Sequence, residues 1–250
     1  MAEFLLLRFD APLQAFGGPI VDNRGAIADF PSLSLITGLL GNALGYRHGD
    51  WSALTRLQDR IRYAVRCDRE GERVRDYQTV SLGQPFLDGT GWTTRGVVDT
   101  RRGGVKNKVG THVRFRDFHA DAVYSVAVSL EPAAGSPDLA DLEAALREPV
   151  RPLFLGRKPC LPSSPILLER RHAGSLTEAL RYVPPLPARR QREDAGPLRA
   201  WVPETEEDRL GQGRALPLVD ARDWRNQVHT GRRIVWEGIL KLEVNDDADS

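Results

Sequence analysis

Two neighbouring stretches decide the predicted fold of this chain: LLLRFDAPLQAFGGP at residues 5–19 and FPSLSLITGLLGNALGY at residues 30–46. The apolar run at residues 4–9 is interrupted only by Arg8, which is typical of a strand in the middle of a sheet. Pro31 and Ser32 then mark the start of a helix, whose apolar residues recur at helical spacing as far as Gly45. We therefore expect a strand followed by a glycine-containing helix in this part of the chain.

Strand-like and helix-like patterns alternate along the rest of the chain. Helical periodicity predicts helices at residues 51–61 and 137–147, and apolar or alternating runs predict strands at residues 62–67, 123–130, 152–156, 166–168 and 234–244. The order strand, helix, strand, insertion, strand, helix, strand corresponds to the ferredoxin-like βαββαβ arrangement, in which helices cover one face of an antiparallel sheet. The predicted fold class is therefore α+β.

Two segments do not belong to this alternation. Residues 68–121 form a basic insertion with strand-like alternation at residues 75–80 and 112–118, which predicts a protruding β-hairpin, while an excursion of this length is also compatible with partial disorder. Residues 184–213 are rich in proline and charge, so a flexible loop is expected there. We divide the chain into a domain at residues 1–182 and a loop-rich C-terminal extension with a final strand at residues 183–250.

The composition is that of a globular protein, with 41% hydrophobic residues among 250 and therefore enough for one large or two modest domains. No apolar run approaches the ~20 residues of a membrane-spanning helix, and the first residues lack a signal-peptide pattern, so a cytoplasmic protein without membrane contact is expected. Cys67 and Cys160 lie far apart, which favours two buried thiols over a zinc site or a disulfide. We predict no metal and no cofactor.

The net charge of +1 hides a locally basic segment. Residues 92–119 carry seven lysines and arginines against Asp99 and Asp117, a local net charge of +5. Such a segment on a nearly neutral protein suggests a directed contact with a polyanion, and the alternative is a solvated surface loop.

No sequence signature of catalysis is present, because the chain lacks a P-loop, a dinucleotide-binding glycine motif and the common hydrolase motifs. The stretch FLGRKPCLPSSP at residues 154–165 is more informative. Gly156 leads into Arg157 and Lys158, and the prolines that follow stiffen the backbone. A rigid turn with two cations can hold a phosphate, or it can be an ordinary surface turn.

Five motifs in order carry a resemblance to a known family: PLQAFG at residues 12–17, FPS at residues 30–32, AVRCD at residues 64–68, RDYQTV at residues 75–80 and LGRKPC at residues 155–160. Together they resemble the CRISPR-associated Cas-five family of the RAMP superfamily, and within it the branch that serves in type I-E Cascade. The resemblance is strong over residues 3–78 and 122–168 and fades after residue 182.

The resemblance implies an RRM-related ferredoxin-like domain in which the insertion at residues 68–121 is a β-hairpin thumb. It also implies a non-catalytic RNA-binding subunit of an antiviral ribonucleoprotein complex, which grips the 5′ handle of the CRISPR RNA (crRNA) and caps one end of the Cascade backbone. The implied partners are this RNA, the neighbouring backbone and large subunits, and target DNA through the assembled complex.

Candidate RNA-binding residues follow from the basic insertion, from the turn at residues 31–34 and from the turn at residues 155–160. Arginines and lysines neutralise phosphates, flat side chains stack on unpaired bases, and a helix N-terminus attracts an anion. Leu33 occupies a position at which the family often has a lysine or arginine. We therefore expect Arg24 or Arg47 to make the phosphate contact of that residue. The candidates are Arg24, Ser32, Ser34, Arg47, Trp92, Arg95, Arg101, Arg102, Lys106, Lys108, His112, Arg114, Phe115, Arg116, Arg157 and Lys158.

Alternatives stay open at this point. Gly38, Gly41 and Gly45 recur at helical spacing, so they serve backbone contact with phosphate, let the helix pack tightly on the sheet, or do both. Relatives in the type I-C branch process precursor crRNA, which suggests a metal-independent endoribonuclease as the alternative function. Its candidate catalytic residues are Tyr46, His48, Lys106, Lys108 and His112. A third possibility is an interaction domain without an RNA role.

Overall fold

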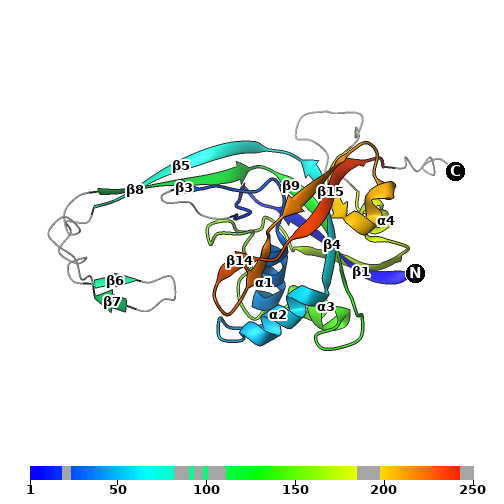
Figure 1. Ribbon diagram of the computed structural model, residues 1–250, viewed down its shortest axis with the longest axis horizontal. Helices are drawn as coiled ribbons and strands as arrows, with labels where there is room; N and C mark the ends of the chain where they lie inside the picture. The colour runs from blue at the N-terminus through cyan, green and yellow to red at the C-terminus, as the bar shows by residue number, and fades with distance from the viewer. Residues whose placement is uncertain (19–23, 82–89, 93–97, 101–110, 185–197, 243–250) are drawn as a thin grey trace.

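The computed structural model describes residues 1–18, 24–81, 90–92, 98–100, 111–184 and 198–242. They form a mixed α/β structure with large antiparallel sheets, and Figure 1 shows a body from which strands extend to one side. Within these ranges, no helix has the length and apolar character needed to cross a membrane.

A seven-stranded sheet runs through the body. Its strands lie in the order β10 (Leu167–Ala173), β1 (Ala2–Asp10), β9 (Val123–Leu130), β4 (Ile61–Arg69), β11 (Leu198–Pro203), β15 (Arg233–Leu240) and β12 (Arg214–Leu218). Every neighbouring pair is antiparallel. Because side chains alternate along a strand, the continuous apolar run of β1 places apolar groups on both faces, and both faces are covered.

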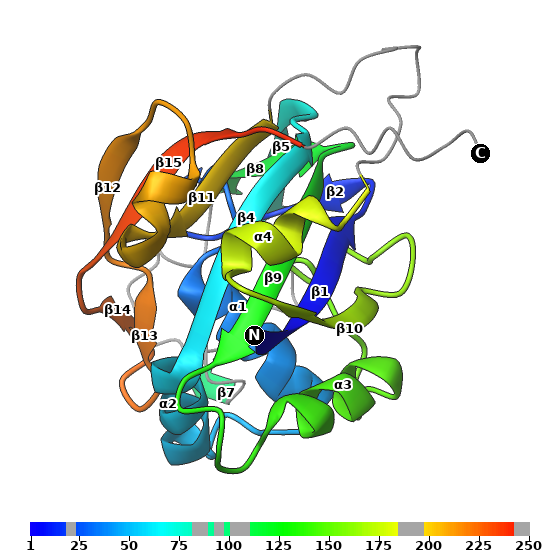
Figure 2. The ribbon, with the colours of Figure 1, turned by 90° about the vertical axis from the view of Figure 1, so that its right-hand side faces the viewer.

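Helices pack on the two faces of this sheet. They are α1 (Leu33–Ala43), α2 (Trp51–Arg60), α3 (Leu139–Arg147) and α4 (Leu176–Arg181), with a 3-10 helix η3 (Glu204–Arg209). Leu7 belongs to the same buried cluster as Ile36 of α1 and Leu142 of α3. Leu6 belongs to a second cluster with Leu180 of α4. Figure 2 shows α4 in front of the sheet and α1 behind it.

A second sheet is built around β8 (Thr111–Ala120). β5 (Glu72–Ser81) pairs antiparallel with the whole length of β8, and β2 (Leu13–Gln14) and β3 (Arg24–Gly25) also pair with β8. We call these four strands the ribbon; β5 and β8 extend away from the body in Figure 1. Two further antiparallel pairs are β6 (Thr90–Trp92) with β7 (Val98–Thr100), and β13 (Ala221–Asp223) with β14 (Val228–Thr230).

Most of the predicted elements are confirmed. The strands expected at residues 4–9, 62–67 and 123–130 lie in β1, β4 and β9, and the expected helices correspond to α1, α2 and α3. Ser32 is the N-cap of α1, and its hydroxyl oxygen accepts a hydrogen bond from the backbone N–H of Leu35 at 3.2 Å. The two alternating stretches of the insertion are paired with each other as β5 and β8.

Three expectations about residues 152–213 are corrected. Residues 152–156 form no strand, because the chain turns there: Gly156 has φ +107°, and Leu155 N–H donates to the carbonyl of Cys160 at 2.8 Å. The strand expected at residues 166–168 continues to Ala173 as the polar edge strand β10. The prediction of a loop at residues 184–213 is wrong for residues 198–209. There β11 joins the central sheet with Trp201 buried, and η3 follows it.

Candidate nucleic-acid interface

One face of the ribbon carries a row of three flat or cationic side chains. In the strand register, Arg24 of β3 and Tyr77 of β5 both lie opposite Phe115 of β8, one on each side. Residues opposite each other across strands share a face, so the three form a row across the ribbon, which we call the stacking row. Arg24 is exposed, and Tyr77 is 60% exposed with its ring centroid 5.5 Å from that of Phe115.

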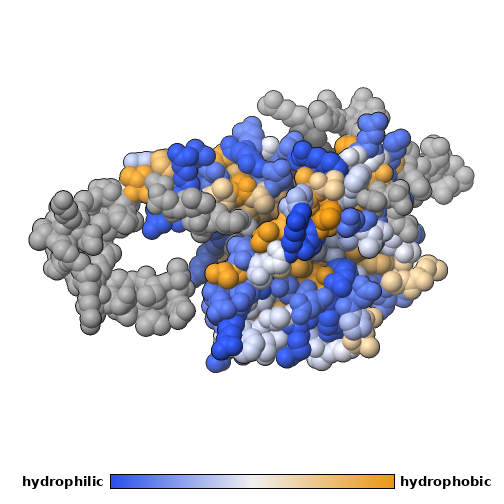
Figure 3. Space-filling model, in the orientation of Figure 1, coloured by the Kyte–Doolittle hydropathy of each residue, from blue (hydrophilic) through white to orange (hydrophobic). Residues whose placement is uncertain are grey.

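The neighbouring pair on this face is charged but balanced. Arg75 donates to both carboxylate oxygens of Asp117, at 2.7 and 3.2 Å, and its guanidinium lies 5.9 Å from the ring of Phe115. Hydrogen bonding from Arg75 lowers the pKa of the Asp117 carboxyl. Exposed aromatic rings beside guanidinium groups are the surface on which unpaired bases stack. Figure 3 shows hydrophilic and apolar groups interleaved over the ribbon.

Two arginines, Arg116 and Arg157, converge on the opposite face beside Gly25. A Cβ at Gly25 would lie 2.8 Å from Nη1 of Arg116 and 2.9 Å from Nη2 of Arg157, so glycine leaves the room that both groups use. Arg157 donates to the backbone carbonyls of Asp117 at 2.8 Å and of Gly25 at 3.0 Å. Its guanidinium also lies 4.8 Å from the ring of Phe118. We call Arg116 and Arg157 the arginine pair.

The arginine pair has no carboxylate ion-paired to it among the described residues. Within the part of the chain that the structure describes, neither member forms an ion pair, and Asp76, which lies opposite Arg116 on β5, instead accepts a hydrogen bond from Gln78 at 2.6 Å. Burial, and next the charge of Arg116, lower the pKa of the Arg157 guanidinium, which nevertheless stays charged at neutral pH. Two adjacent cations, neither of them ion-paired to a described carboxylate, favour a bound anion such as phosphate.

The turn at residues 155–160 holds Arg157 in this position. Ala15 N–H donates to the carbonyl of Leu155 at 3.0 Å, which fastens the turn to the segment after β2. Gly156 is required there, because a Cβ would lie 1.9 Å from the carbonyl oxygen of Ala15. The expected rigid turn is present, Arg157 points to the ribbon and Lys158 is exposed beside it.

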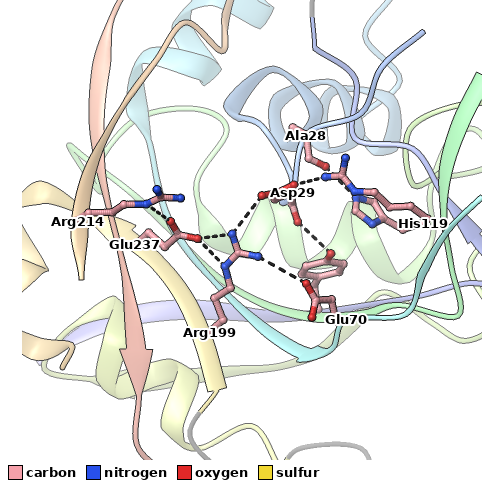
Figure 4. A network of polar contacts seen from close by, with 9 residues as sticks. Ala28, Asp29, Glu70, His119, Arg199, Arg214 and Glu237 are labelled. Atoms are coloured by element: carbon pink, nitrogen blue, oxygen red, sulfur yellow. Dashed lines mark hydrogen bonds and ion pairs between the residues drawn. The ribbon is translucent and has the colours of Figure 1, made fainter. Parts of the chain in front are cut away.

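Charged and aromatic side chains fasten the root of the ribbon to the body (Figure 4). Arg199 contacts Asp29 at 3.1 Å and Glu70 at 3.8 Å, and it also pairs with Glu237. Asp29 forms an ion pair with Arg73 of β5 as well. Asp29, Glu70, Arg73 and Arg199 line a pocket of about 140 Å³. Their ion pairs fix the start of β5 against the body.

The ribbon and the central sheet both contact the segment that precedes α1, through His119 of β8 and Tyr124 of β9. A ring nitrogen of His119 on β8 lies 2.8 Å from the carbonyl oxygen of Ala28, and Tyr124 donates to the carbonyl oxygen of Asp29 at 3.0 Å. Burial lowers the pKa of His119 and raises that of the Cys67 thiol in the same pocket to about 12. Both are therefore uncharged at neutral pH, and Cys67 is a buried thiol, as Cys160 is.

The N-terminus of α1, where a phosphate was expected, already has a partner within the chain. The backbone N–H of Leu33 donates to Oδ2 of Asp220 at 2.9 Å, and that of Ser34 donates to the carbonyl of Asp220 at 3.0 Å. Ser32 and Ser34 are buried, and their hydroxyl oxygens lie 3.0 Å apart. This arrangement favours a structural role for the turn at residues 31–34.

The glycines of α1 serve packing and termination. A Cβ at Gly41 would lie 2.6 Å from Cδ2 of Leu54 on α2, and one at Gly38 would lie 3.5 Å from the ring of Trp224. Gly45 has φ +84°, and Tyr46 N–H donates to the carbonyl of Gly41 at 2.8 Å, which closes the helix with a Schellman motif. These positions therefore fit the packing alternative. The glycines let α1 pack closely against α2 and Trp224, and not against the sheet.

The other candidate residues are distributed over the molecule. Arg95, Arg101, Arg102, Lys106 and Lys108 lie outside the described residues. Arg114 lies two residues before Arg116 on β8, while Trp92 lies on β6 and His112 at the start of β8. Arg47 and His48 are exposed between α1 and α2, and Tyr46 is partly buried there. That loop belongs to the body, whereas the His112 end of β8 is the end far from the body in Figure 1.

Sequence reasoning missed Tyr77 and Arg75 as candidates. Both lie in the stretch RDYQTV, and their alternation along β5 would have placed them on one face. Their partners on β8 could not be assigned without the register. No three histidine, cysteine or acidic residues gather as metal ligands in the described part of the chain.

The comparisons with known proteins agree on one family. Residues 4–236 match the family described as CRISPR-associated protein (Cas_Cas5). The chain is 32% identical over 184 residues to the "CRISPR system Cascade subunit CasD" of Escherichia coli (strain K12), an alignment that covers 72% of this chain and 76% of that one.

Two solved structures are similar to the whole chain. A chain of a "CRISPR RNA-guided surveillance complex" superposes with a TM-score of 0.69 at 28% identity, over 96% of this chain and 91% of that one. The structure titled "Crystal structure of Cas protein" superposes with a TM-score of 0.61 at 24% identity, over 95% and 94% of the two chains, and supports the fold alone. The chain belongs to the CRISPR-associated Cas5 family.

Proposed function

We propose that this chain is the crRNA-binding subunit of a type I-E Cascade complex, where it grips the 5′ handle of the crRNA and caps one end of the backbone. The observation that carries the proposal is the ribbon, with the stacking row on one face and the arginine pair on the other. Family membership and the similarity to a Cascade subunit support it.

We also propose that the domain at residues 1–182 is ferredoxin-like and RRM-related. The strand order β10-β1-β9-β4, antiparallel throughout, supports this proposal, as does the position of α1 and α3 between successive strands of the set. The thumb is proposed to be the insertion at residues 68–121, which includes β5 and β8. The C-terminal extension at residues 183–250 then completes the central sheet through β11, β15 and β12.

The ribbon suggests how RNA is held. A base would stack on Tyr77 and Phe115 beside Arg24, and such stacking stabilises binding by about 1–3 kcal/mol per base. The arginine pair would hold a phosphate on the opposite face, and each phosphate contact contributes a slope of about 0.7 to the salt dependence for a single strand. Trp92, Arg95, Arg101, Arg102, Lys106, Lys108, His112, Arg114 and Lys158 remain proposed contacts of the same RNA.

We propose no catalytic step. Tyr46 and His48 lie in the body, whereas His112 begins the strand at the far end of the ribbon, and this separation argues against one acid–base set. The neighbouring backbone and large subunits are proposed partners, and target DNA is reached through the assembled complex.

Binding and cleavage can be tested on the same samples. The full chain is incubated with end-labelled cognate repeat RNA in EDTA and run on native and denaturing gels. We expect retained, intact RNA and a retention that is weakened in the Arg116→Gln, Arg157→Gln double variant. Arg147→Gln is the matched control, because Arg147 is exposed on α3 and pairs with Glu143.

Two results would contradict the proposal. Equal retention by the double variant and the control would mean that the arginine pair does not bind RNA. A discrete cleavage product lost in Tyr46→Phe or His112→Ala would identify a processing nuclease instead.

A further inference from the structure

A second basic surface lies outside the ribbon, on the turn between β13 and β14. Residues 220–233 contain four arginines and two aspartates, a net charge of +2. β14 lies on the flank of the body below the ribbon, on the side toward which β5 and β8 extend in Figure 1. A nucleic-acid strand bound to the ribbon would therefore lie on the same side of the molecule as this surface.

Both aspartates of this segment already have partners within the chain. Asp220 pairs with Arg233 at 2.7 Å. Asp223 accepts hydrogen bonds from the backbone N–H of Arg225 and of Asn226, each at 2.9 Å, and from the side-chain amide of Asn226 at 2.7 Å. The carboxylates therefore shape the turn, and Arg222 and Arg225 form no ion pair with any described residue.

Arg222 is a partly buried cation with spare hydrogen-bonding capacity. Its Nη2 donates to the side-chain oxygen of Gln227 at 2.7 Å, but its buried Nε has no partner among the described residues. Burial lowers the pKa of Arg222. A half-buried guanidinium that has no carboxylate partner among the described residues favours an anion at its accessible N–H groups.

An exposed tryptophan, Trp51, lies beside Arg225. Trp51 is 43% exposed at the start of α2, and the guanidinium of Arg225 lies 5.5 Å from its ring centroid. Gln58 of α2 fixes the two elements together, since its side chain bonds the backbone N–H and carbonyl of Arg222, each at 3.0 Å, and the indole N–H of Trp224 at 3.2 Å. Trp51 and the two arginines are therefore held on one rigid unit.

We propose that Trp51, Arg222 and Arg225 form a second contact for single-stranded nucleic acid, in which a base stacks on Trp51 beside Arg225 and a phosphate binds Arg222. A flat ring capped by a guanidinium suits a base, and an unpaired arginine alongside suits the adjoining phosphate. The inference rests on the proposed function, which supplies the RNA strand that would reach this surface. An acidic protein segment would need the arginines but not the ring.

The test measures the affinity of the full chain for a long fluorescein-labelled oligouridine by fluorescence anisotropy. With the long oligomer, Trp51→Ala should weaken binding about tenfold, and Trp51→Phe should retain most of the affinity. Arg222→Gln should lower the salt slope by about 0.7. Arg56→Gln, an exposed arginine on another face of α2, is the matched control and should bind like the unchanged chain.

The outcomes separate this inference from the proposed function. If Trp51→Ala and Arg222→Gln bind the long oligomer as the control does, while the Arg116→Gln, Arg157→Gln variant loses binding, the second contact is wrong and the ribbon proposal stands. If none of these variants changes binding, both fail. A loss with Trp51→Ala that Trp51→Phe shares, at an unchanged melting temperature, would also overturn the stacking role.

Discussion

The carboxylate of Asp220 accepts a hydrogen bond from the backbone N–H of Leu33 at 2.9 Å. The same carboxylate accepts two hydrogen bonds from Arg233, at 2.8 and 2.7 Å. An anion is thus supplied to the positive end of α1 by a residue far along the chain, where a ligand phosphate would otherwise be favoured. Burial opposes the charged form of Asp220, but hydrogen bonding from Arg233 outweighs it and lowers the pKa of this carboxyl from its ordinary value.

Asp220→Asn should lower the free energy of unfolding by about 2–4 kcal/mol at neutral pH, because Arg233 loses its counter-charge. Since the pKa of Asp220 is lower in the folded state, its contribution is present above about pH 4 and is lost as the pH falls through the folded-state value. Urea unfolding at neutral and acid pH measures this. A difference between the two proteins that persists at acid pH would contradict the argument.

Gly25→Ala should weaken RNA binding with little change in stability. The new Cβ would displace the guanidinium ends of Arg116 and Arg157, which are flexible enough to move aside. We expect a salt slope lower by about 0.7 to 1.4, for one or two lost phosphate contacts. Gly17→Ala is the control, since a Cβ there has nothing within 4 Å. Equal salt slopes for the two variants would argue against an anion site at Gly25.

Tyr77→Ala should weaken binding of single-stranded RNA by about 1–3 kcal/mol, and Tyr77→Phe should restore it, because stacking requires the ring and not the hydroxyl. Stability should change little, as the side chain is 60% exposed. Tyr182→Ala is a matched control. Tyr182 is 46% exposed, and the guanidinium of Arg171 lies 4.4 Å from the centre of its ring. It lies directly after α4 and therefore outside the ribbon. Anisotropy titrations measure both affinities. Equal RNA affinities for Tyr77→Ala and Tyr182→Ala would contradict the proposal that bases stack on the stacking row.

Gly156→Ala should destabilise the protein by more than about 3 kcal/mol, because both the positive φ and the contact with the backbone of Ala15 exclude a side chain. Thermal unfolding compared with Gly49→Ala, where a Cβ is unobstructed, measures the effect. If both variants melt alike, the turn tolerates a side chain and does not fix Arg157.

Asp68→Asn should cost about 3–5 kcal/mol, because Arg66 and Asp68 form an ion pair in which both side chains are 0% exposed. Arg66 also donates to the carbonyls of Leu180 and Val183, at 2.5 and 2.7 Å, and so holds the end of α4 on the sheet. Chemical denaturation gives the value. A cost below about 1 kcal/mol, as for exposed pairs, would show that water replaces the lost partner.

The site was only partly predictable. The turn that presents Arg157 was recognised, since glycine and proline mark turns locally. The arginine pair was not, because Arg157 meets Arg116 only through its hydrogen bonds to Gly25 of β3 and Asp117 of β8. Tyr77 was overlooked for the same reason, as its partner Phe115 lies on another strand.

Local patterns were sufficient for β1, α1, α2, β4, β9 and α3, because apolar periodicity records which face of each element is buried. Local patterns also revealed the basic insertion and the family. The position of β11, the capping of α1 by Asp220 and the two faces of the ribbon depend on contacts between residues far apart in the chain. Such contacts leave no local period, so they became visible only when the packed strands fixed which residues meet.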